Sequence, residues 1–185
     1  MVEKDNNNTI KKVTLLKVIN NELKEGMKKY VLYSLTCHIK EIQGNKEIEN
    51  QIILKKRYSD FFTLRKKLLQ RWPRVYIHNI PPKKAIGNLD NSIIETRQRI
   101  LNKFCEKLIS ISYLSESEEV LKFVTSNDSS KELEKLPGLK PEEILFKYQK
   151  AIKDYYEAYD LKFGKEKLDK FKELLTSIET TIKVI

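Results

Sequence analysis

The chain has 185 residues, 40% of them hydrophobic, so it can hold one domain plus an extension but is short for two full domains. Its formal net charge is +10, and the excess lies in residues 1–125, where 24 Lys and Arg face 14 Asp and Glu; residues 126–185 carry 12 of each. Such an excess suits an anionic membrane, a nucleic acid or an acidic partner. Its position predicts that the first 125 residues hold the anion-facing surface.

The residue types that build catalytic and metal sites are sparse. Cys37 and Cys105 have neither metal-binding nor disulfide spacing, and His38 and His78 do not suggest a catalytic or metal pair. The five glycines form no loop that would cradle a phosphate. We therefore predict that the protein is not an enzyme and holds no metal or cofactor.

Hydropathy predicts no membrane-spanning helix, because no run of about 18 apolar residues occurs. The polar, Asn-rich residues 1–9 carry no apolar signal region and are expected to be disordered. Two unpaired cysteines suit a reducing compartment. We expect a cytosolic protein whose membrane contact, if it has one, is peripheral.

The first predicted elements are three strands. Apolar residues between Lys12 and Asn20 indicate the first, the aromatic and β-branched run from Tyr30 to Ile39 the second, and Ile48 to Tyr58 the third. A polar stretch with Gly26 and a turn at Gly44 connect them. Short connections between consecutive strands predict an antiparallel meander.

The pattern then changes to helical spacing. A helix is predicted from about Phe61, with Ser59 or Asp60 as its cap, and Trp72-Pro73 ends it. After an irregular stretch to Leu89, a second helix runs from Asp90 or Asn91 to about Ile109, and a shorter one spans Ser117 to Val124. Strands followed by helices predict a small α+β domain over residues 10–126.

The remaining residues are predicted to form a linker and a helical extension. Residues 127–141 are linker-like in composition, being rich in Ser, Asp and Asn at the start and broken by Pro137-Gly138 near the end. Residues 142–185 are amphipathic and predict two helices that meet near Gly164. Two helices alone bury little surface. We expect them to pack on the domain, to self-associate or to bind a partner.

Three short segments carry the functional signal. They are Arg57-Tyr58-Ser59-Asp60-Phe61 between a strand and a helix, Ile80-Pro81-Pro82-Lys83-Lys84 in a loop, and Arg97-Gln98-Arg99-Ile100-Leu101 on a helix. Arginine offers a planar fork of donors that matches phosphate, lysine acts as a point charge, and an aromatic face can lie against a ring. Together they suit a compact polyanion with a flat hydroxylated ring, such as an inositol phosphate.

The order and spacing of these segments resemble the Phox-homology (PX) domain, a phosphoinositide-binding module. The resemblance implies that Arg57 binds the 3-phosphate, that Tyr58 stacks on the inositol ring and that Arg97 bonds the hydroxyls at positions 4 and 5. It assigns the phosphate that links ring to lipid to Lys83, with Lys84 as an alternative in register. Ser59 is a further candidate contact. Lys56 departs from the resemblance, because many members have a second arginine there, and we expect any contact it makes to lie at the rim.

The loop residues Ala85 and Ile86, and Met27 in the first strand turn, are candidates for insertion into a membrane, although Ile86 also suits a buried loop anchor. The resemblance implies a sorting-nexin-like protein recruited by phosphatidylinositol 3-phosphate to the cytosolic face of endosomes. One alternative is a PX-fold scaffold for protein partners with weak lipid binding. The other is a nucleic-acid-binding helix face, formed by Arg97, Arg99, Lys103 and Lys107. This alternative gives no function to the Arg-Tyr pair or to the proline loop. We therefore expect no nucleic acid.

Overall fold

A computed structural model gives the fold and describes residues 10–25, 29–44, 46–82 and 90–157, together with Lys172 and Thr176. The chain divides into two compact units, residues 1–139 and 140–185. The expected disorder of residues 1–9 lies outside the described residues.

Three long strands form the sheet, in the order β1 (Ile10–Lys24), β2 (Tyr30–Gln43) and β3 (Lys46–Arg57), all antiparallel. β2 lies in the middle, and its alternate residues Tyr33, Leu35, Cys37 and Ile39 are buried, as expected when successive side chains point to opposite faces of a sheet. The predicted meander is therefore confirmed. Each strand is longer than predicted, because polar residues continue the pairing past the apolar segments.

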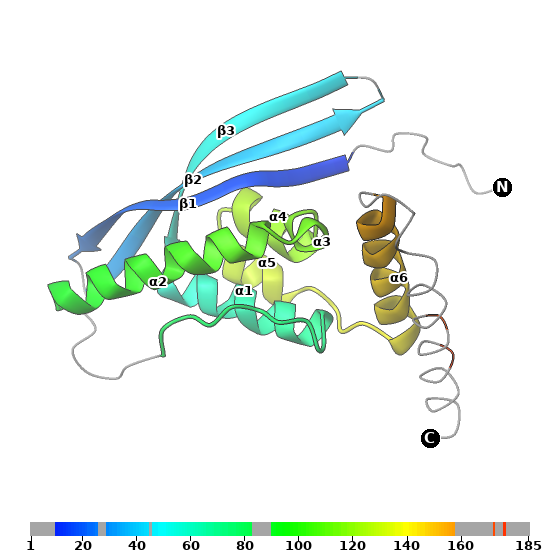
Figure 1. Cartoon of the computed structure of the whole chain (residues 1–185). Coiled ribbons are helices and arrows are strands. Elements are labelled where there is room, and N and C mark those ends of the chain that lie inside the picture. Colours follow the sequence, from blue (N-terminus) through cyan, green and yellow to red (C-terminus); the bar gives the residue numbers. More distant parts are fainter. Residues whose placement is uncertain are drawn as a thin grey trace. The chain divides into compact units, whose positions relative to one another are not determined.

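Five helices follow the sheet: α1 (Tyr58–Arg71), α2 (Asn91–Ile109), α3 (Ser112–Ser115), α4 (Glu118–Thr125) and α5 (Ser129–Glu134). They gather on one side of the sheet, with α2 running along β1 (Figure 1). Their buried side chains, led by Phe61, Leu101, Phe104 and Phe123, join those of β2 in one core. The predicted α+β class is confirmed.

A break in the register of β1 fixes α2 to the sheet. The pairing of β1 with β2 shifts between Val18 and Asn20, as at a β-bulge. The Val18 N–H donates to the side-chain oxygen of Asn102 at 2.9 Å, and the Asn21 side chain donates to that of Gln98. Polar contacts from the middle of α2 therefore set where this helix lies along β1.

Residues 127–136 belong to the domain, which corrects the linker predicted over 127–141. The polar residues of this segment start a helix instead: Asp128 caps α5 by accepting from the Lys131 N–H at 3.3 Å. The apolar side chains that follow are buried, Leu133 completely and Leu136 at 5% exposure. α5 packs against α1 and α4 and so completes the core.

A buried ion pair ties α1 to α4. Arg71 and Glu119 are almost inaccessible, and the Arg71 guanidinium donates to the Glu119 carboxylate, while Trp72 Nε1 also donates to it at 3.4 Å. Arg71 additionally donates to the carbonyl of Pro137 at 2.6 Å. One side chain thus links the end of α1, the start of α4 and the last residues of the first unit.

In the second unit, α6 (Pro141–Glu157) confirms the first predicted tail helix. Lys172 and Thr176 are helical, and the rest of the second tail helix lies outside the described residues. In the parts of the chain that the structure describes, no helix has the length and apolarity needed to cross a membrane.

Candidate anion-binding site

The first and third of the segments that carry the functional signal meet at one end of the sheet. β1 ends and β2 begins there, with Lys24 paired to Tyr30, and β3 ends there, with Arg57 paired to Leu32. The first half of α2 lies at the same end, as the Asn21 to Gln98 hydrogen bond requires (Figure 1). The fold therefore brings Arg57, Tyr58 and Arg97 together, although 40 positions separate the two arginines.

Arg57 lies at the junction of β3 and α1 and is exposed. Its guanidinium carbon lies 3.7 Å from the centre of the Tyr30 ring, a cation–π contact that fixes the planar group. Its backbone N–H donates to the Asp60 carboxylate at 2.7 Å, and the other carboxylate oxygen accepts from Ser130 Oγ at 2.6 Å. The Arg57 backbone is thus held from α1 and α5, while the donor edge of the guanidinium remains available.

Arg97 and Tyr58 form the deeper part of the site. The Arg97 guanidinium carbon lies 4.8 Å from the centre of the Tyr58 ring, and only 7% of Arg97 is exposed. Burial raises the pKa of the Tyr58 hydroxyl above its ordinary value, and the positive charges of Arg97 and Arg65 oppose the rise. A ligand can therefore reach Arg97 only with the part that inserts deepest.

The proline loop is attached to this pair. The Tyr58 hydroxyl donates to the carbonyl of Pro81, directly before Pro82. Earlier in the same loop, Arg65 Nε donates to the carbonyl of His78 at 3.0 Å, and Arg65 Nη2 donates to Asn79 Oδ1 at 2.7 Å. These bonds hold residues 78–81 against α1.

Lys56 does not lie at the rim, which corrects the prediction for this residue. It is 2% exposed, donates to the carbonyl of Ser126 at 2.8 Å and lies 5.2 Å from the centre of the Phe123 ring. Strand alternation explains its position, since neighbouring residues of β3 point to opposite faces. Lys56 supports the junction after α4 and takes no part in the anion-binding surface.

The other predicted site residues divide into two groups. Ser59 is exposed in the first turn of α1, beside Arg57 and Tyr58. Lys83, Lys84, Ala85, Ile86 and Met27 lie outside the described residues, so their predicted roles remain predictions. Sequence reasoning missed Tyr30 and Arg65, because their partners come from distant segments and no local motif marks them.

The basic helix face proposed for nucleic acid is divided by the structure. Arg97 is buried against Tyr58, whereas Arg99, Lys103 and Lys107 are exposed on the outer side of α2. Side chains two residues apart on a helix are rotated by about 200° around its axis, so Arg97 and Arg99 point in nearly opposite directions. The four cations therefore do not form one face. Among the residues that the structure describes, no group of His, Cys, Asp and Glu side chains could hold a metal ion.

Comparison with known proteins points to one family. Residues 44–127 match the model of the PX domain. The chain is 34% identical over 115 residues to the sorting nexin MVP1 of Candida albicans, covering 61% of this chain and 15% of that protein. It is 34% identical over 99 residues to the sorting nexin-20 of Bos taurus, covering 52% of this chain and 30% of that protein. The chain thus spans less than a third of the length of either relative.

Among solved structures, a designed CISK-PX domain is 34% identical to this chain, with a TM-score of 0.48, and the match covers 61% of this chain and all of that one. The mouse SNX19 PX domain with a bound sulphate ion is 24% identical, with a TM-score of 0.44, and the match covers 62% of this chain and 97% of that one.

Proposed function

This chain is a sorting-nexin-like protein of the Phox-homology (PX) domain family, and from that premise we propose that it binds a phosphoinositide on the surface of a membrane. The lipid we assign is phosphatidylinositol 3-phosphate, and the process is endosomal sorting and vesicle traffic. The observation that carries the proposal is the junction at which Arg57 and the Tyr58–Arg97 pair meet at one end of the sheet.

The two arginines have different tasks because they differ in exposure. Arg57 is exposed and fixed on Tyr30, so its free donor edge suits a doubly charged phosphate at the 3-position. Arg97 is almost buried, so we assign it to the ring hydroxyls at positions 4 and 5. An arginine at those hydroxyls leaves little room for further phosphates, which favours the 3-monophosphate.

The loop after Pro82 completes the proposed site. Lys83, or Lys84 in the alternative register, is assigned to the phosphate that links the ring to the lipid. The Tyr58–Pro81 hydrogen bond supports this assignment, because it ties the start of the loop to the ring-binding residue. Ala85 and Ile86, with Met27 from the first strand turn, are proposed to enter the membrane; burying one large apolar side chain contributes about 1.5–3 kcal/mol. Ser59 remains a candidate for a further contact with the head group.

Vesicle co-sedimentation tests the proposal. Wild-type protein is mixed with vesicles that each contain one phosphoinositide, and we expect selective binding to the 3-phosphate lipid. Arg57→Gln removes a charge-assisted contact worth about 1.5–3 kcal/mol, so binding should weaken about ten- to hundredfold. Arg97→Lys keeps the charge but loses the flat stacking on Tyr58, and a smaller loss is expected.

The matched control is Arg74→Gln. Arg74 is an exposed arginine in the turn after α1, so this substitution removes the same charge outside the proposed site. It should bind like the wild type. Binding that follows total lipid charge, and that Arg57→Gln and Arg74→Gln weaken equally, would refute the head-group pocket.

A further inference from the structure

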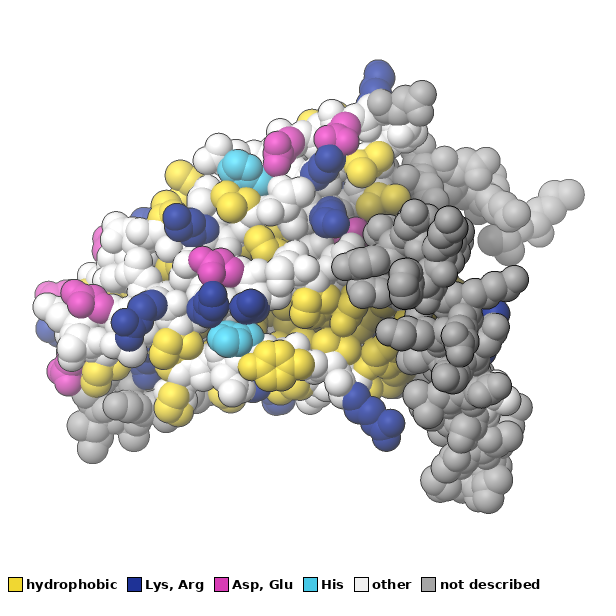
Figure 2. Space-filling view, in the orientation of Figure 1, with side chains coloured by type: hydrophobic (Ala, Val, Ile, Leu, Met, Phe, Trp, Pro, Cys, Tyr) yellow, Lys and Arg dark blue, Asp and Glu magenta, His cyan; other side chains and the backbone are white. Residues whose placement is uncertain are grey.

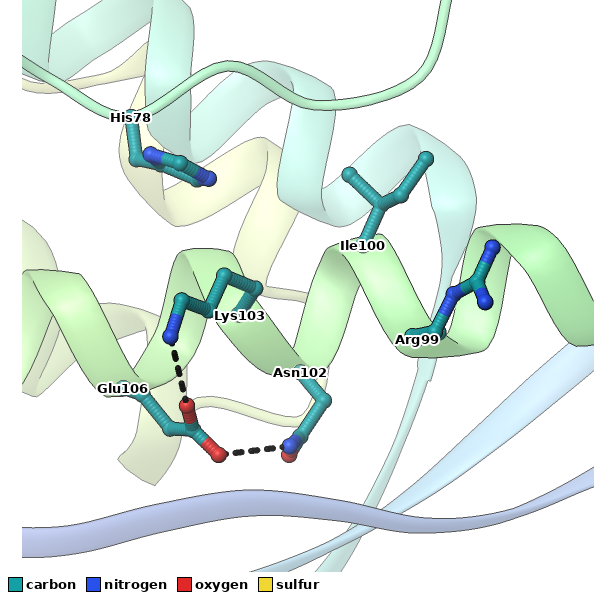
Figure 3. A pocket seen from close by; sticks show the side chains of 6 residues that line it. All are labelled: His78, Arg99, Ile100, Asn102, Lys103 and Glu106. Carbon is teal, nitrogen blue, oxygen red and sulfur yellow. Dashed lines mark hydrogen bonds and ion pairs between the residues drawn. The ribbon is translucent and has the colours of Figure 1, made fainter.

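Two hollows that share His78 lie along α2. The larger, of about 440 Å³, is lined by His78, Arg99, Ile100, Asn102, Lys103 and Glu106 (Figure 3). The smaller, of about 90 Å³, shares His78 and adds, among others, Tyr76, Lys107 and Leu108. We refer to both together as the α2 groove, with α2 as one wall and residues 76–78 as the other.

The second wall is held in place without a ligand. Ile77 is 3% exposed and anchors the segment in the core, while its neighbours Tyr76 and His78 turn outward. From behind, Arg65 binds the His78 carbonyl at 3.0 Å. The rings of Tyr76 and His78 are in edge contact, with centres 6.3 Å apart, and 71% of Tyr76 is exposed. An aromatic side chain this exposed at the mouth of a preformed groove is available to a partner.

The α2 wall is basic. Arg99, Lys103 and Lys107 are all exposed and follow each other at intervals of four residues, which places them in a row along one side of the helix. Glu106 is the acidic lining residue, and it is engaged by Lys103 at 3.8 Å and by Asn102 at 2.8 Å (Figure 3). Three cations against one carboxylate make the wall complementary to an anion. Figure 2 shows basic side chains next to hydrophobic ones on this face of the molecule.

The spacing of the cations indicates what kind of anion fits. Four residues of α-helix rise about 6 Å, and two residues of an extended peptide rise about 6.6 Å, so acidic side chains at alternate positions match the row. The residues between them point the other way, toward the wall that carries Tyr76 and His78. We propose that the α2 groove binds an extended acidic peptide of a partner protein, with acidic residues at alternate positions.

The position of the groove favours a peptide over a lipid. Along the helix axis, Lys103 and Lys107 lie about 9 and 15 Å beyond Arg97, away from the first turn of α2. Under the proposed function, on which this orientation rests, the membrane lies at the Arg57 end. Screening reduces a surface potential over about 8–10 Å in physiological salt, so the far part of the row lies outside the reach of the lipid charges.

Fluorescence anisotropy on the full chain tests the proposal. The probe is a labelled, capped peptide in which every second residue is Glu and the residues between are Leu or Ser. The control peptide has Gln in place of each Glu. The combined variant Arg99→Gln, Lys103→Gln, Lys107→Gln should lose about tenfold in affinity for the Glu peptide, since each exposed pair contributes a few-fold. The matched variant Lys17→Gln, Lys46→Gln, Lys66→Gln removes three exposed lysines from β1, β3 and α1 and should bind like the wild type.

Vesicle binding is measured beside it. The groove variant should keep its affinity for vesicles with the 3-phosphate lipid, and Arg57→Gln should keep its affinity for the Glu peptide, so failure of one site is distinguishable from failure of the other. The proposal is overturned if the two triple variants lose peptide affinity equally, if the Gln peptide binds as well as the Glu peptide, or if the Glu peptide does not bind at all. If the groove variant lost vesicle binding and the matched triple variant did not, the groove would be assigned to lipid and the peptide proposal would also be overturned.

Discussion

Lys55, Lys56 and Arg57 follow one another at the end of β3, and each side chain has a different environment. Lys55 is exposed and pairs with Glu22 at 3.4 Å, Lys56 is buried against Phe123, and Arg57 lies on Tyr30. Strand alternation sends the middle residue to the helical side of the sheet and its neighbours to the other side. A run of three cations thus separates into a surface pair, an internal support and a proposed ligand contact.

Burial predicts a pH dependence for Lys56. Its pKa is lowered mainly by desolvation, against the opposing effect of Asp60 and Asp128. Between the lowered pKa and the ordinary value of about 10.4, the unfolded chain binds more protons than the folded one, so this group adds stability as pH rises through that window. Lys56→Met removes this contribution. The free energy of unfolding of the wild type should therefore rise relative to Lys56→Met from pH 7 to pH 10, by at most about 1.4 kcal/mol per pH unit.

Urea denaturation at both pH values measures the difference. Lys55→Met is the control for loss of a lysine at the end of β3, because the adjacent side chain is exposed. A difference between wild type and Lys56→Met that is constant with pH would contradict the lowered pKa.

At the scale of elements, apolar periodicity predicted the three strands and the helices α1, α2 and α4, because each has its own buried face. It failed for α5, where Asp128 and the serines read as a linker although Asp128 is a helix cap and Leu133 is fully buried. Of the site, the resemblance anticipated that Tyr58 and Arg97 lie together, while Lys83 lies outside the described residues. It could not anticipate Tyr30 beside Arg57, since tertiary structure alone brings that contact about, nor that Lys56 points inward.

The contribution of α5 to the domain can be measured with one leucine. Leu133→Ala removes a fully buried side chain between α5 and its neighbours and should lower the free energy of unfolding by about 2–5 kcal/mol. Leu69→Ala, on the partly exposed face of α1 at 42% exposure, is the matched control and should cost less than about 1 kcal/mol. If urea denaturation showed equally small losses in the free energy of unfolding for both variants, residues 127–136 would behave as the linker that their composition predicts.

At the scale of the whole molecule, the two units differ in charge and content. The core and the described residues of the proposed head-group site belong to residues 1–139, which hold 26 Lys and Arg against 17 Asp and Glu, whereas residues 140–185 hold 10 against 9. Residues 140–185 begin with α6, on which Phe146 is 68% exposed. Under the proposed function, this division separates lipid binding from the role proposed for the tail, which is self-association or the binding of a partner.

A chain truncated after residue 139 tests that division. We expect it to unfold in one cooperative transition and to bind 3-phosphate vesicles within about twofold of the full chain, because it keeps the core, α5 and nearly all of the net positive charge. Sedimentation of both forms shows whether the tail self-associates. A truncated chain that folds but binds vesicles far more weakly would place part of the membrane affinity in the tail.

The site is built from the end of β3, the start of α1 and the middle of α2, with Ser130 of α5 supporting it through Asp60. These residues are adjacent only in the folded chain, so the ligand binds the native state and not the unfolded one. By mass action, a ligand at a hundred times its dissociation constant adds about 2.7 kcal/mol to the free energy of unfolding. Under the proposed function, the protein is therefore more resistant to unfolding and proteolysis while it is on the membrane than after it leaves, and membrane occupancy sets its lifetime as well as its location.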